Sequence, residues 1–445
     1  MENWLEGLGA KGLEDLALAD FPVTGRGIQA KKNFKQGERI LTIPKAALWT
    51  VELAYADPLI GSILHSAQPA LSVENIVAVY LLFVRSRDDG YDGQRTHVAT
   101  IPSSYSSSIF FEDELEVCAG SSLYNITKQL CQQIDDDYRE LVVGVFGPHS
   151  DLFPLDKFTI NDYKWALCTF WSRAMDFQLP NGSSIRLMAP FADMINHSPE
   201  VQQCHAYDPR SGSLSILAGK EYKAGDQVYI YYGSIPNNRL LRLYGFVTPK
   251  NPHDSYDLIL STHPMAPLYE QKLKLWQLTN LGETPTIPLT LTGPLPNKVL
   301  QYLRIQRLNE SDFASIASQG NDAAKAAISD SNEVEVLSFL VESISSLLDG
   351  GNSWAAAHVS LGEQRVLRQA KKKAESLLTA AESKSNTNNT GSMSAPALCI
   401  KCGKTSGQLM LCGRCGSVRY CSRDCQVAHF KQHKPICQAI ASNKC

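Results

Sequence analysis

The sequence has no run of eighteen apolar residues, so we expect no membrane-spanning helix. Its N-terminus also lacks a basic start followed by a continuous apolar core, so we expect no secretory signal. Both absences predict a protein of the cytoplasm, the nucleus or both. The 445 residues are 44% hydrophobic and 20% charged, which is ordinary for a soluble protein of two or three domains.

Cysteine is scarce in the body of the chain and abundant at its end. Four of the twelve cysteines are scattered through the body, whereas eight lie between Cys399 and Cys445. Because no secretion is expected, this clustering favours metal binding in a reducing compartment over a disulfide framework. Acids are scarce in the same tail, where only Asp424 accompanies eight Lys or Arg. Zinc-bound thiolates would offset part of this charge, and we do not expect direct nucleic-acid binding.

Strand patterns occur near both ends of the first half of the chain. Residues 25–34 and 38–43 are predicted strands on either side of a Gln36-Gly37 turn. Residues 213–218 and 227–233 are also predicted strands, and the turn signal between them favours a hairpin. The sequence therefore predicts an α+β protein with strands in two separated stretches.

Helical patterns fill the space between these strands and the region after them. Residues 70–85 and 112–145 read as mainly helical, and helical periodicity dominates from about residue 265. Ser360 and Glu363 form a capping box that predicts the start of a basic helix reaching about residue 383. Residues 384–397 are rich in Ser, Asn and Thr, which predicts a flexible linker.

The tail supplies enough ligands for two tetrahedral zinc sites. A two-residue gap in a turn, or a three-residue gap on a helix, places both ligands of a pair on one ion. With no open coordination position expected, the sites are predicted to be structural and to supply most of the folding free energy of the tail. His429 is a rival ligand one helical turn from two members of the set, and Cys445 lies outside the pattern. The four pairs are Cys399 with Cys402, Cys412 with Cys415, Cys421 with Cys425, and His433 with Cys437.

This spacing, with Tyr420-Cys421 and the pattern CQVAHFKQHKPIC, resembles the MYND zinc finger. The resemblance implies docking of short proline-containing peptides. Phe430 stands where the family usually carries Trp, and we expect it to pack as an aromatic there. The resemblance also implies interleaved pairing, in which one zinc is bound by Cys399, Cys402, Cys421 and Cys425, and the other by Cys412, Cys415, His433 and Cys437.

Four motifs occur in order in the body, and each is weak alone. They are Gly25-Arg26-Gly27, the run Asp193-Met-Ile-Asn196-His197-Ser198, Tyr231-Tyr232-Gly233, and Tyr244-Gly245-Phe246. Together they resemble a SET-domain protein methyltransferase of the subgroup typified by the Rubisco large-subunit lysine methyltransferase. Pro236 departs from that subgroup, which commonly has Ser there. The stretches that carry the resemblance are GRGIQAKKNFKQGERILTIP (25–44), MAPFADMINHS (188–198) and YYGSIPNNRLLRLYGFV (231–247).

The resemblance implies an α+β fold with four parts. A SET domain would occupy residues 1–250, with its β-fold split by a helical insert at about 50–165. An all-α substrate-binding domain would follow at 255–383. After the linker at 384–397, the zinc-bound MYND module would occupy 398–437.

The resemblance also implies S-adenosylmethionine as cofactor. Methyl transfer is an in-line displacement, so orientation matters more than strong acid–base chemistry. Glycines let a backbone approach a ligand where a Cβ would clash, and Arg suits a bidentate carboxylate contact. The residues implied to bind the cofactor are Gly25, Arg26, Gly27, Arg173, Asn196, His197 and Tyr232.

Tyr232 is the predicted catalytic residue, with Tyr244 and Phe246 as candidate walls of a lysine channel. An unperturbed phenol has a pKa near ~10, so Tyr232 would orient the amine rather than deprotonate it. Each tyrosine could instead be an ordinary core aromatic. Arg173 could form a surface ion pair, and Asp193 is expected to orient the Asn-His turn rather than contact the cofactor.

Three functions remain open from the sequence. The first is transfer of a methyl group to a lysine of a protein substrate. The second is transfer to a histidine, because one relative in this subgroup methylates histidine. The third is an inert interaction platform that keeps the fold and the zinc finger but has lost cofactor binding.

Overall fold

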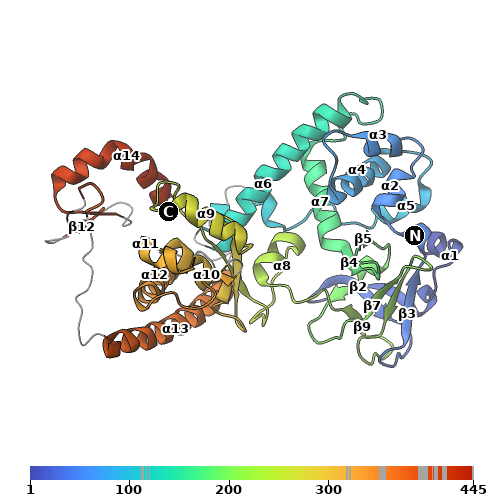
Figure 1. Ribbon diagram of the computed structural model, residues 1–445. Helices are drawn as coiled ribbons and strands as arrows, with labels where there is room; N and C mark the ends of the chain where they lie inside the picture. The colour runs from blue at the N-terminus through green and yellow to red at the C-terminus, as the bar shows by residue number, and fades with distance from the viewer. Residues whose placement is uncertain are drawn as a thin grey trace. The chain divides into compact units, whose positions relative to one another are not determined.

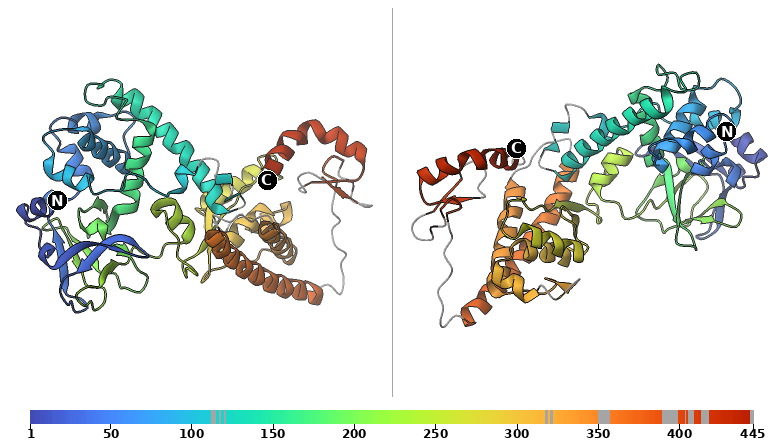
Figure 2. Two further views of the ribbon diagram at one scale, coloured as in Figure 1. Left: turned by 180° about the vertical axis from the view of Figure 1, so that it is seen from behind. Right: turned by 45° about the horizontal axis from the view of Figure 1, so that its top comes forward.

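The computed structural model describes residues 1–111, 115–116, 118–119, 121–316, 319, 322–349, 357–388, 399–402, 404, 409–412 and 418–442. The chain divides into two compact units (Figures 1 and 2). Unit 1 contains residues 1–113 and 125–248, and unit 2 contains residues 114–124 and 249–445.

The strands of unit 1 form three small sheets with the orders β1-β2-β9-β6, β3-β8-β7 and β4-β5. One apolar core lies under them and includes Ile28, Ile43 and Val228, none of which is exposed. The strands are β1 (Leu16–Phe21), β2 (Gly25–Ala30), β3 (Arg39–Ile43), β4 (Ala174–Gln178), β5 (Ser184–Met188), β6 (Asn196–His197), β7 (His205–Asp208), β8 (Ser213–Leu217) and β9 (Gln227–Ile230).

The hairpin predicted from residues 213–233 is wrong. β8 pairs with β3 and β7, whereas β9 pairs with β2 and β6 in another sheet. The connection between them is too long to impose pairing on its flanking strands, unlike a two-residue turn. The connection contacts the end of β2 instead, where the Gly225 amide donates a hydrogen bond to the Ala30 carbonyl at 2.8 Å.

The helices of unit 1 include an insert between β3 and β4, which gathers on one side of the strands (Figures 1 and 2). α4 begins where the Ser72 hydroxyl accepts a hydrogen bond from the Asn75 amide, and its apolar sequence is buried on all sides. α7 begins with a capping box between Thr159 and Asp162. The helices are α1 (Glu2–Gly7), α2 (Val51–Tyr55), α3 (Gly61–Ser66), α4 (Val73–Ser86), α5 (Asp92–Val98), α6 (Ser122–Leu141, whose residues up to Tyr124 belong to unit 2), α7 (Ile160–Arg173) and α8 (Asn237–Tyr244).

Unit 2 is mainly helical, with a core that includes Trp276 stacked on Tyr302 at 4.6 Å between ring centroids. It also contains an antiparallel strand pair, β10 (Ser255–Ile259) and β11 (Thr286–Thr290), which the helical periodicity did not reveal. No described helix of the chain is long and apolar enough to cross a membrane. The helices are α9 (Tyr269–Leu278), α10 (Asn297–Gln306), α11 (Glu310–Ile316), α12 (Asp330–Asp349) and α13 (Ala357–Asn388).

The capping box predicted at Ser360 is also wrong, because α13 already includes Ala357. The carboxyl oxygens of Glu363 accept hydrogen bonds from the amide and hydroxyl of Ser122. α13 continues to Asn388, so it takes up the first residues of the expected linker at 384–397; residues 389–397 lie outside the described residues.

The C-terminal module has a two-stranded pair, β12 (Met410–Leu411) and β13 (Arg419–Tyr420), followed by α14 (Arg423–Ser442). Its buried residues, among those described, are Tyr420, His433 and three cysteines. An apolar core of this size cannot stabilise a fold by itself. The cysteines must therefore contribute to the free energy of folding by a means other than apolar burial.

Candidate active site and zinc sites

Asn196 and Gly27 meet at the edge of one sheet. β6 and β2 both pair with β9, which brings these two motifs together from opposite ends of unit 1. The Asn196 side-chain amide donates to the Arg26 carbonyl at 3.0 Å. A Cβ on Gly27 would lie 2.8 Å from Asn196 Nδ2 and 2.5 Å from Gln227 Nε2. A Cβ at Gly27 would therefore displace the ends of two side chains, which is a packing reason for glycine beside the cofactor contact that the resemblance implies.

Gly25 and Arg26 have different roles in this strand. Gly25 has φ of 65°, which favours glycine, and a Cβ there would meet no protein atom within 4 Å. The Arg26 guanidinium donates to the carbonyl of Thr100, at the end of α5 in the insert. The side chain of Arg26 is thus turned toward the insert.

Arg173 and Asp193 form a buried ion pair rather than a surface one. Arg173 Nη1 lies 3.0 Å from Asp193 Oδ2, and the Asp193 side chain is completely buried. The second partner of the same oxygen is His97 Nε2, also at 3.0 Å. Burial raises the pKa of Asp193, but His97 and Arg173 outweigh burial and hold that pKa below its usual range. Within the described residues, Arg173 Nε has no hydrogen-bond partner although it is buried.

Tyr232 lies between His197 and the turn that follows Asp193. Its hydroxyl donates to the Ile195 carbonyl at 2.9 Å, and its amide donates to His197 Nδ1 at 3.1 Å. The two rings lie 5.1 Å apart. Burial raises the pKa of Tyr232 above its usual range, so the phenol stays protonated. This state agrees with an orienting role and not with that of a base.

Tyr244 lies beside Tyr232, with 5.3 Å between the ring centroids. α8, which carries Tyr244, ends at Gly245, whose φ of 76° is typical of a helix end. Phe246 contacts the Tyr244 ring at 6.1 Å but is partly exposed. The Tyr231 hydroxyl instead contacts Ser234 at 2.9 Å.

A cavity of about 140 Å³ connects these groups. Engineered cavities of about 150 Å³ hold a benzene ring, so this one has room for a single side-chain group. Its walls come from the end of α7, from β4, from the turn that holds Ala192 and Asp193, from β7, and from the ends of β9 and α8. Of the predicted site residues it brings together Arg173, Tyr232 and Tyr244, whereas Asn196 and His197 lie next to it along the chain.

Four residues of this region belong to none of the sequence motifs. Met175, Gln203 and His205 line the cavity, and His97 binds Asp193 behind it. Burial lowers the pKa of His205, so the ring is neutral. Each is a single residue with no recurring spacing, and only the folded chain brings it to the site.

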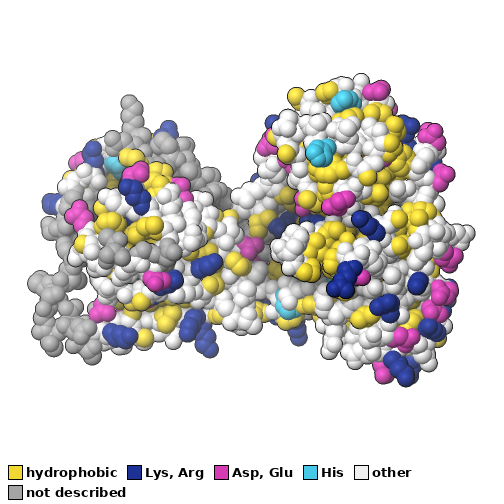
Figure 3. Space-filling model, turned by 45° about the vertical axis from the view of Figure 1, so that its right-hand side comes forward, with side chains coloured by type: hydrophobic (Ala, Val, Ile, Leu, Met, Phe, Trp, Pro, Cys, Tyr) yellow, Lys and Arg dark blue, Asp and Glu magenta, His cyan; other side chains and the backbone are white. Residues whose placement is uncertain are grey.

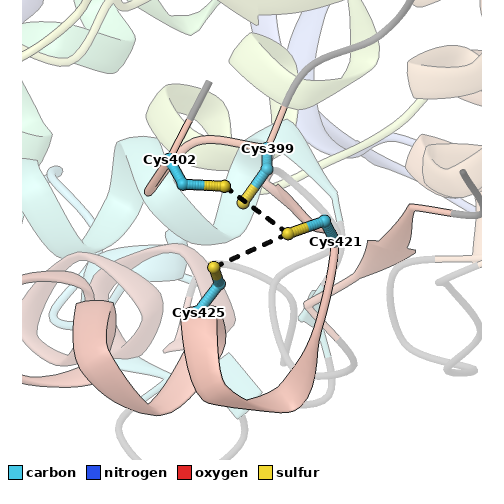
Figure 4. Close-up of side chains that lie close together, drawn as sticks. All are labelled: Cys399, Cys402, Cys421 and Cys425. Atoms are coloured by element: carbon cyan, nitrogen blue, oxygen red, sulfur yellow. Dashed lines mark hydrogen bonds between the residues drawn. The ribbon is translucent and has the colours of Figure 1, made fainter. Parts of the chain in front are cut away.

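Four cysteines of the tail converge on one point (Figure 4). Their sulfurs all lie within 4.8 Å of one another, and the Cys402 and Cys421 sulfurs are 3.5 Å apart. Sulfurs around a tetrahedral zinc ion are about 3.8 Å apart, given Zn–S bonds of about 2.3 Å. The group therefore fits zinc. Its members are Cys399, Cys402, Cys421 and Cys425.

A second group contains Cys412, His433 and Cys437. His433 Nε2 lies 3.3 Å from Cys412 Sγ, and the sulfurs of Cys412 and Cys437 are 3.6 Å apart. The fourth predicted ligand, Cys415, lies outside the described residues, as does Cys445. These two groups divide the described ligands as interleaved pairing predicts.

His429 and Phe430 differ from two of the expectations. His429 contacts the Tyr420 hydroxyl through Nδ1 at 3.0 Å and stacks on His433, so it is not part of either ligand group. Phe430 is 53% exposed and does not pack in the interior of the module. A helix position that faces outward explains its exposure, since α14 buries its ligand-bearing face.

Three family models match the chain. The SET domain matches residues 25–233, the Rubisco LSMT substrate-binding domain residues 263–367, and the MYND finger residues 399–437. All three were implied by the resemblances in the sequence, which are confirmed. The Cys/His groups fit the zinc that a MYND finger binds.

The relatives are enzymes that methylate proteins. The chain is 28% identical to the Rubisco large subunit N-methyltransferase of Nicotiana tabacum, covering 78% of this chain and 75% of that protein. It is 27% identical to the fructose-bisphosphate aldolase-lysine N-methyltransferase of Arabidopsis thaliana, with 82% and 80% covered. The actin-histidine N-methyltransferase of Rattus norvegicus is 26% identical, with 78% and 60% covered.

The fold also matches a solved structure. The SET domain of LSMT bound to methyllysine and AdoHcy superposes with a TM-score of 0.75 and 25% identity. The match covers 88% of this chain and 96% of that chain.

Proposed function

Because the chain belongs to the SET-domain proteins of the Rubisco large-subunit methyltransferase type, with a MYND finger added, we propose that it methylates a lysine of another protein. The observation that carries this proposal is the cavity in which Tyr232 and Tyr244 meet Arg173. S-adenosylmethionine supplies the methyl group, held on a sulfonium sulfur. We assign the other tasks to residues of the chain.

Arg173, Asn196 and His197 are our proposed cofactor-binding residues. Arg173 uses Nη1 for Asp193, which leaves its buried Nε as a donor without a partner among the described residues. A buried donor of this kind is costly unless a ligand satisfies it, and a carboxylate fits a guanidinium best. This match supports a cofactor that carries an amino-acid carboxylate.

Tyr232 is our proposed orienting residue. Its proton is committed to the Ile195 carbonyl, so the lone pairs of its oxygen remain available inside the cavity. A lysine amine must be uncharged to attack, and burial away from water lowers the pKa of lysine. The oxygen of Tyr232 can then accept a hydrogen bond from the amine and align its lone pair.

Lysine is favoured over histidine because the aldolase relative is a lysine N-methyltransferase and the matched LSMT structure holds methyllysine. Met175, Ile230 and Tyr244 supply apolar surface suited to the methylene chain of lysine. A histidine acceptor would need a polar partner for its second ring nitrogen, and Gln203 is the candidate for that task. We therefore propose lysine, and mass spectrometry of the methylated residue distinguishes the two.

The MYND finger is our proposed recruitment module. Half-exposed apolar side chains on its described surface offer a docking site for a short apolar peptide, such as one containing proline. We do not propose nucleic acid as a partner of the chain. Acidic and basic side chains are interspersed on the face of the whole chain that Figure 3 shows. The apolar side chains are Ile400, Met410, Leu411, Val427 and Phe430. Fluorescence anisotropy with a labelled proline-containing peptide tests this, with Phe430→Ser expected to weaken binding.

The proposed activity is tested with radiolabelled S-adenosylmethionine. The full-length protein is added to extract from cells that lack its gene, and label is expected in a protein band whose modified residue is lysine. Asn196→Ala is expected to abolish the label, because it removes the contact to Arg26. An inert platform would give no label and no heat of cofactor binding in calorimetry with the wild-type chain.

A further inference from the structure

His97 lies in the insert, 96 positions before Asp193 in the sequence, yet it makes one of the most buried polar contacts in unit 1. We infer that His97 is a positioning residue for the proposed methyl transfer, which fixes Asp193 and the turn that presents Ile195 and Asn196 to the site. The inference rests on the proposed function, and it makes the helical insert part of the cofactor site.

The contact between His97 and Asp193 is short and buried. His97 Nε2 lies 3.0 Å from Asp193 Oδ2, and neither side chain is exposed. An ionised carboxylate only accepts hydrogen bonds, so His97 must carry its proton on Nε2. The same oxygen accepts from Arg173, so His97 and Arg173 hold Asp193 from two directions. Loss of either donor leaves a buried charge with one contact fewer.

Asp193 lies in a turn that needs such support. Phe191, two residues earlier, has φ of 70°, a conformation that residues other than glycine rarely adopt. Such a conformation persists only where the surroundings fix it. Two residues after Asp193, the Ile195 carbonyl accepts a hydrogen bond from the Tyr232 hydroxyl. Asn196 is the next residue in the chain. A shift of Asp193 would therefore move the acceptor of Tyr232 and the amide of Asn196 together.

The end of α5 contacts the site at a second point. The carbonyl of Thr100, three residues after His97, accepts a hydrogen bond from the Arg26 guanidinium. The Thr100 amide and hydroxyl both donate to the His97 carbonyl, at 2.8 and 2.6 Å. Trp49 packs against the His97 ring at 5.9 Å. One turn of chain in the insert thus holds both the Gly25–Gly27 strand and the Asp193 turn.

The test compares two substitutions of His97 in the full-length protein. His97→Gln keeps a donor near the position of Nε2, whereas His97→Leu removes it. Calorimetry with S-adenosylhomocysteine is expected to show a Kd raised about tenfold or more for His97→Leu. For His97→Gln we expect a Kd within about threefold of the wild-type value. Rescue by Gln would show that the donor matters, because both substitutions replace the same buried ring.

Tyr91→Phe is the matched control. It removes the 2.6 Å hydrogen bond from Tyr91 to Asp57 in the same insert, without touching the Asp193 turn. It is expected to lower the melting temperature and to leave the Kd for S-adenosylhomocysteine unchanged. A loss of affinity in this control as large as that in His97→Leu would assign the effect to general destabilisation and overturn the inference.

A second measurement applies if His97→Leu does not fold. His97→Met fills the space with a flexible apolar chain, and hydrogen exchange is followed at the amides of the turn, where Asp193, Met194 and Ile195 donate to backbone carbonyls. Faster exchange there in His97→Met than in His97→Gln supports the inference, and equal exchange overturns it. A folded His97→Leu that binds with wild-type affinity also overturns it. If the wild-type chain does not bind S-adenosylhomocysteine at all, the proposed function itself fails.

Discussion

The hydroxyl of Tyr232 donates a hydrogen bond to the carbonyl oxygen of Ile195 at 2.9 Å. This bond commits the phenolic proton to the backbone and leaves the oxygen facing the cavity as an acceptor. Because burial raises the pKa of Tyr232, the arrangement persists across the physiological pH range. The hydroxyl can therefore direct an amine without taking its proton.

Tyr232→Phe is expected to lower the rate of methyl transfer about 10²- to 10³-fold, as does removal of a single orienting group in other enzymes. The ring is retained, so its packing against His197 and Tyr244 should persist. Transfer of radiolabel from S-adenosylmethionine measures the rate. Calorimetry with S-adenosylhomocysteine checks that the cofactor still binds.

Tyr231→Phe is the control for this prediction. It removes a neighbouring hydroxyl, which contacts Ser234 and does not line the cavity. Activity close to that of the wild type is expected. Equal rates for Tyr232→Phe and the wild type would exclude Tyr232 from the chemistry.

Gly27→Ala is expected to destabilise unit 1 more than Gly25→Ala. A Cβ at Gly27 would overlap the amides of Asn196 and Gln227, and such overpacking costs about 1–3 kcal/mol. At Gly25 the new Cβ meets no protein atom, so only the positive φ opposes it, at about 1 kcal/mol. Chemical denaturation of both variants measures the difference. A larger loss in Gly25→Ala would mean that Asn196 and Gln227 move aside easily.

The motifs led to Tyr232, which lines the cavity, and the local spacing of the Cys and His residues led to two groups that could hold a metal. The sheets were harder to predict. Strand partners depend on distant segments, so the pairing of β9 with β2 was not visible in a turn signal at residues 223–226. His97 was missed for the same reason, because its partner is far away in the chain.

Glu363 shows how a local pattern can be overridden. Its spacing from Ser360 is typical of a capping box, but the folded chain offers it the amide and hydroxyl of Ser122. These two donors lie in the segment that packs with α13 in unit 2. The contact between Glu363 and Ser122 therefore took the place of the capping box that the sequence favoured.

Removal of zinc is expected to unfold the finger and to spare the methyltransferase body. All described groups of three or more possible metal ligands lie in the finger, whereas every residue lining the cavity belongs to unit 1. Cys421→Ser should lower the zinc content from two ions per chain to about one, measured by mass spectrometry of the metal. Cys204→Ser, at a buried cysteine of the body, should keep two. Full zinc content in Cys421→Ser would remove Cys421 from the ligand set.

Glu363 predicts a pH dependence for the stability of unit 2. Burial, together with the nearby Asp257 and Asp254, raises its pKa to about 8 against the opposing effect of the hydrogen bonds from Ser122. In the unfolded chain a glutamate releases its proton near pH ~4.3. Between these values only the unfolded chain is ionised, so rising pH favours unfolding, by at most ~1.4 kcal/mol per pH unit. The stabilisation by the protonated carboxyl is complete below the lower value and is lost as pH rises through the upper one.

Glu363→Gln is expected to remove this dependence, because the amide keeps one acceptor oxygen for Ser122 and cannot ionise. Urea denaturation of the full-length protein at pH 5 and pH 8 should show the wild type losing stability relative to the variant as the pH rises. Glu375→Gln removes an exposed carboxylate from the same helix and should leave the wild-type pH slope intact. Parallel slopes for the wild type and Glu363→Gln would mean that Glu363 is already ionised in the folded chain. In that case the buried carboxylate would have to be stabilised by Ser122 more strongly than burial penalises it.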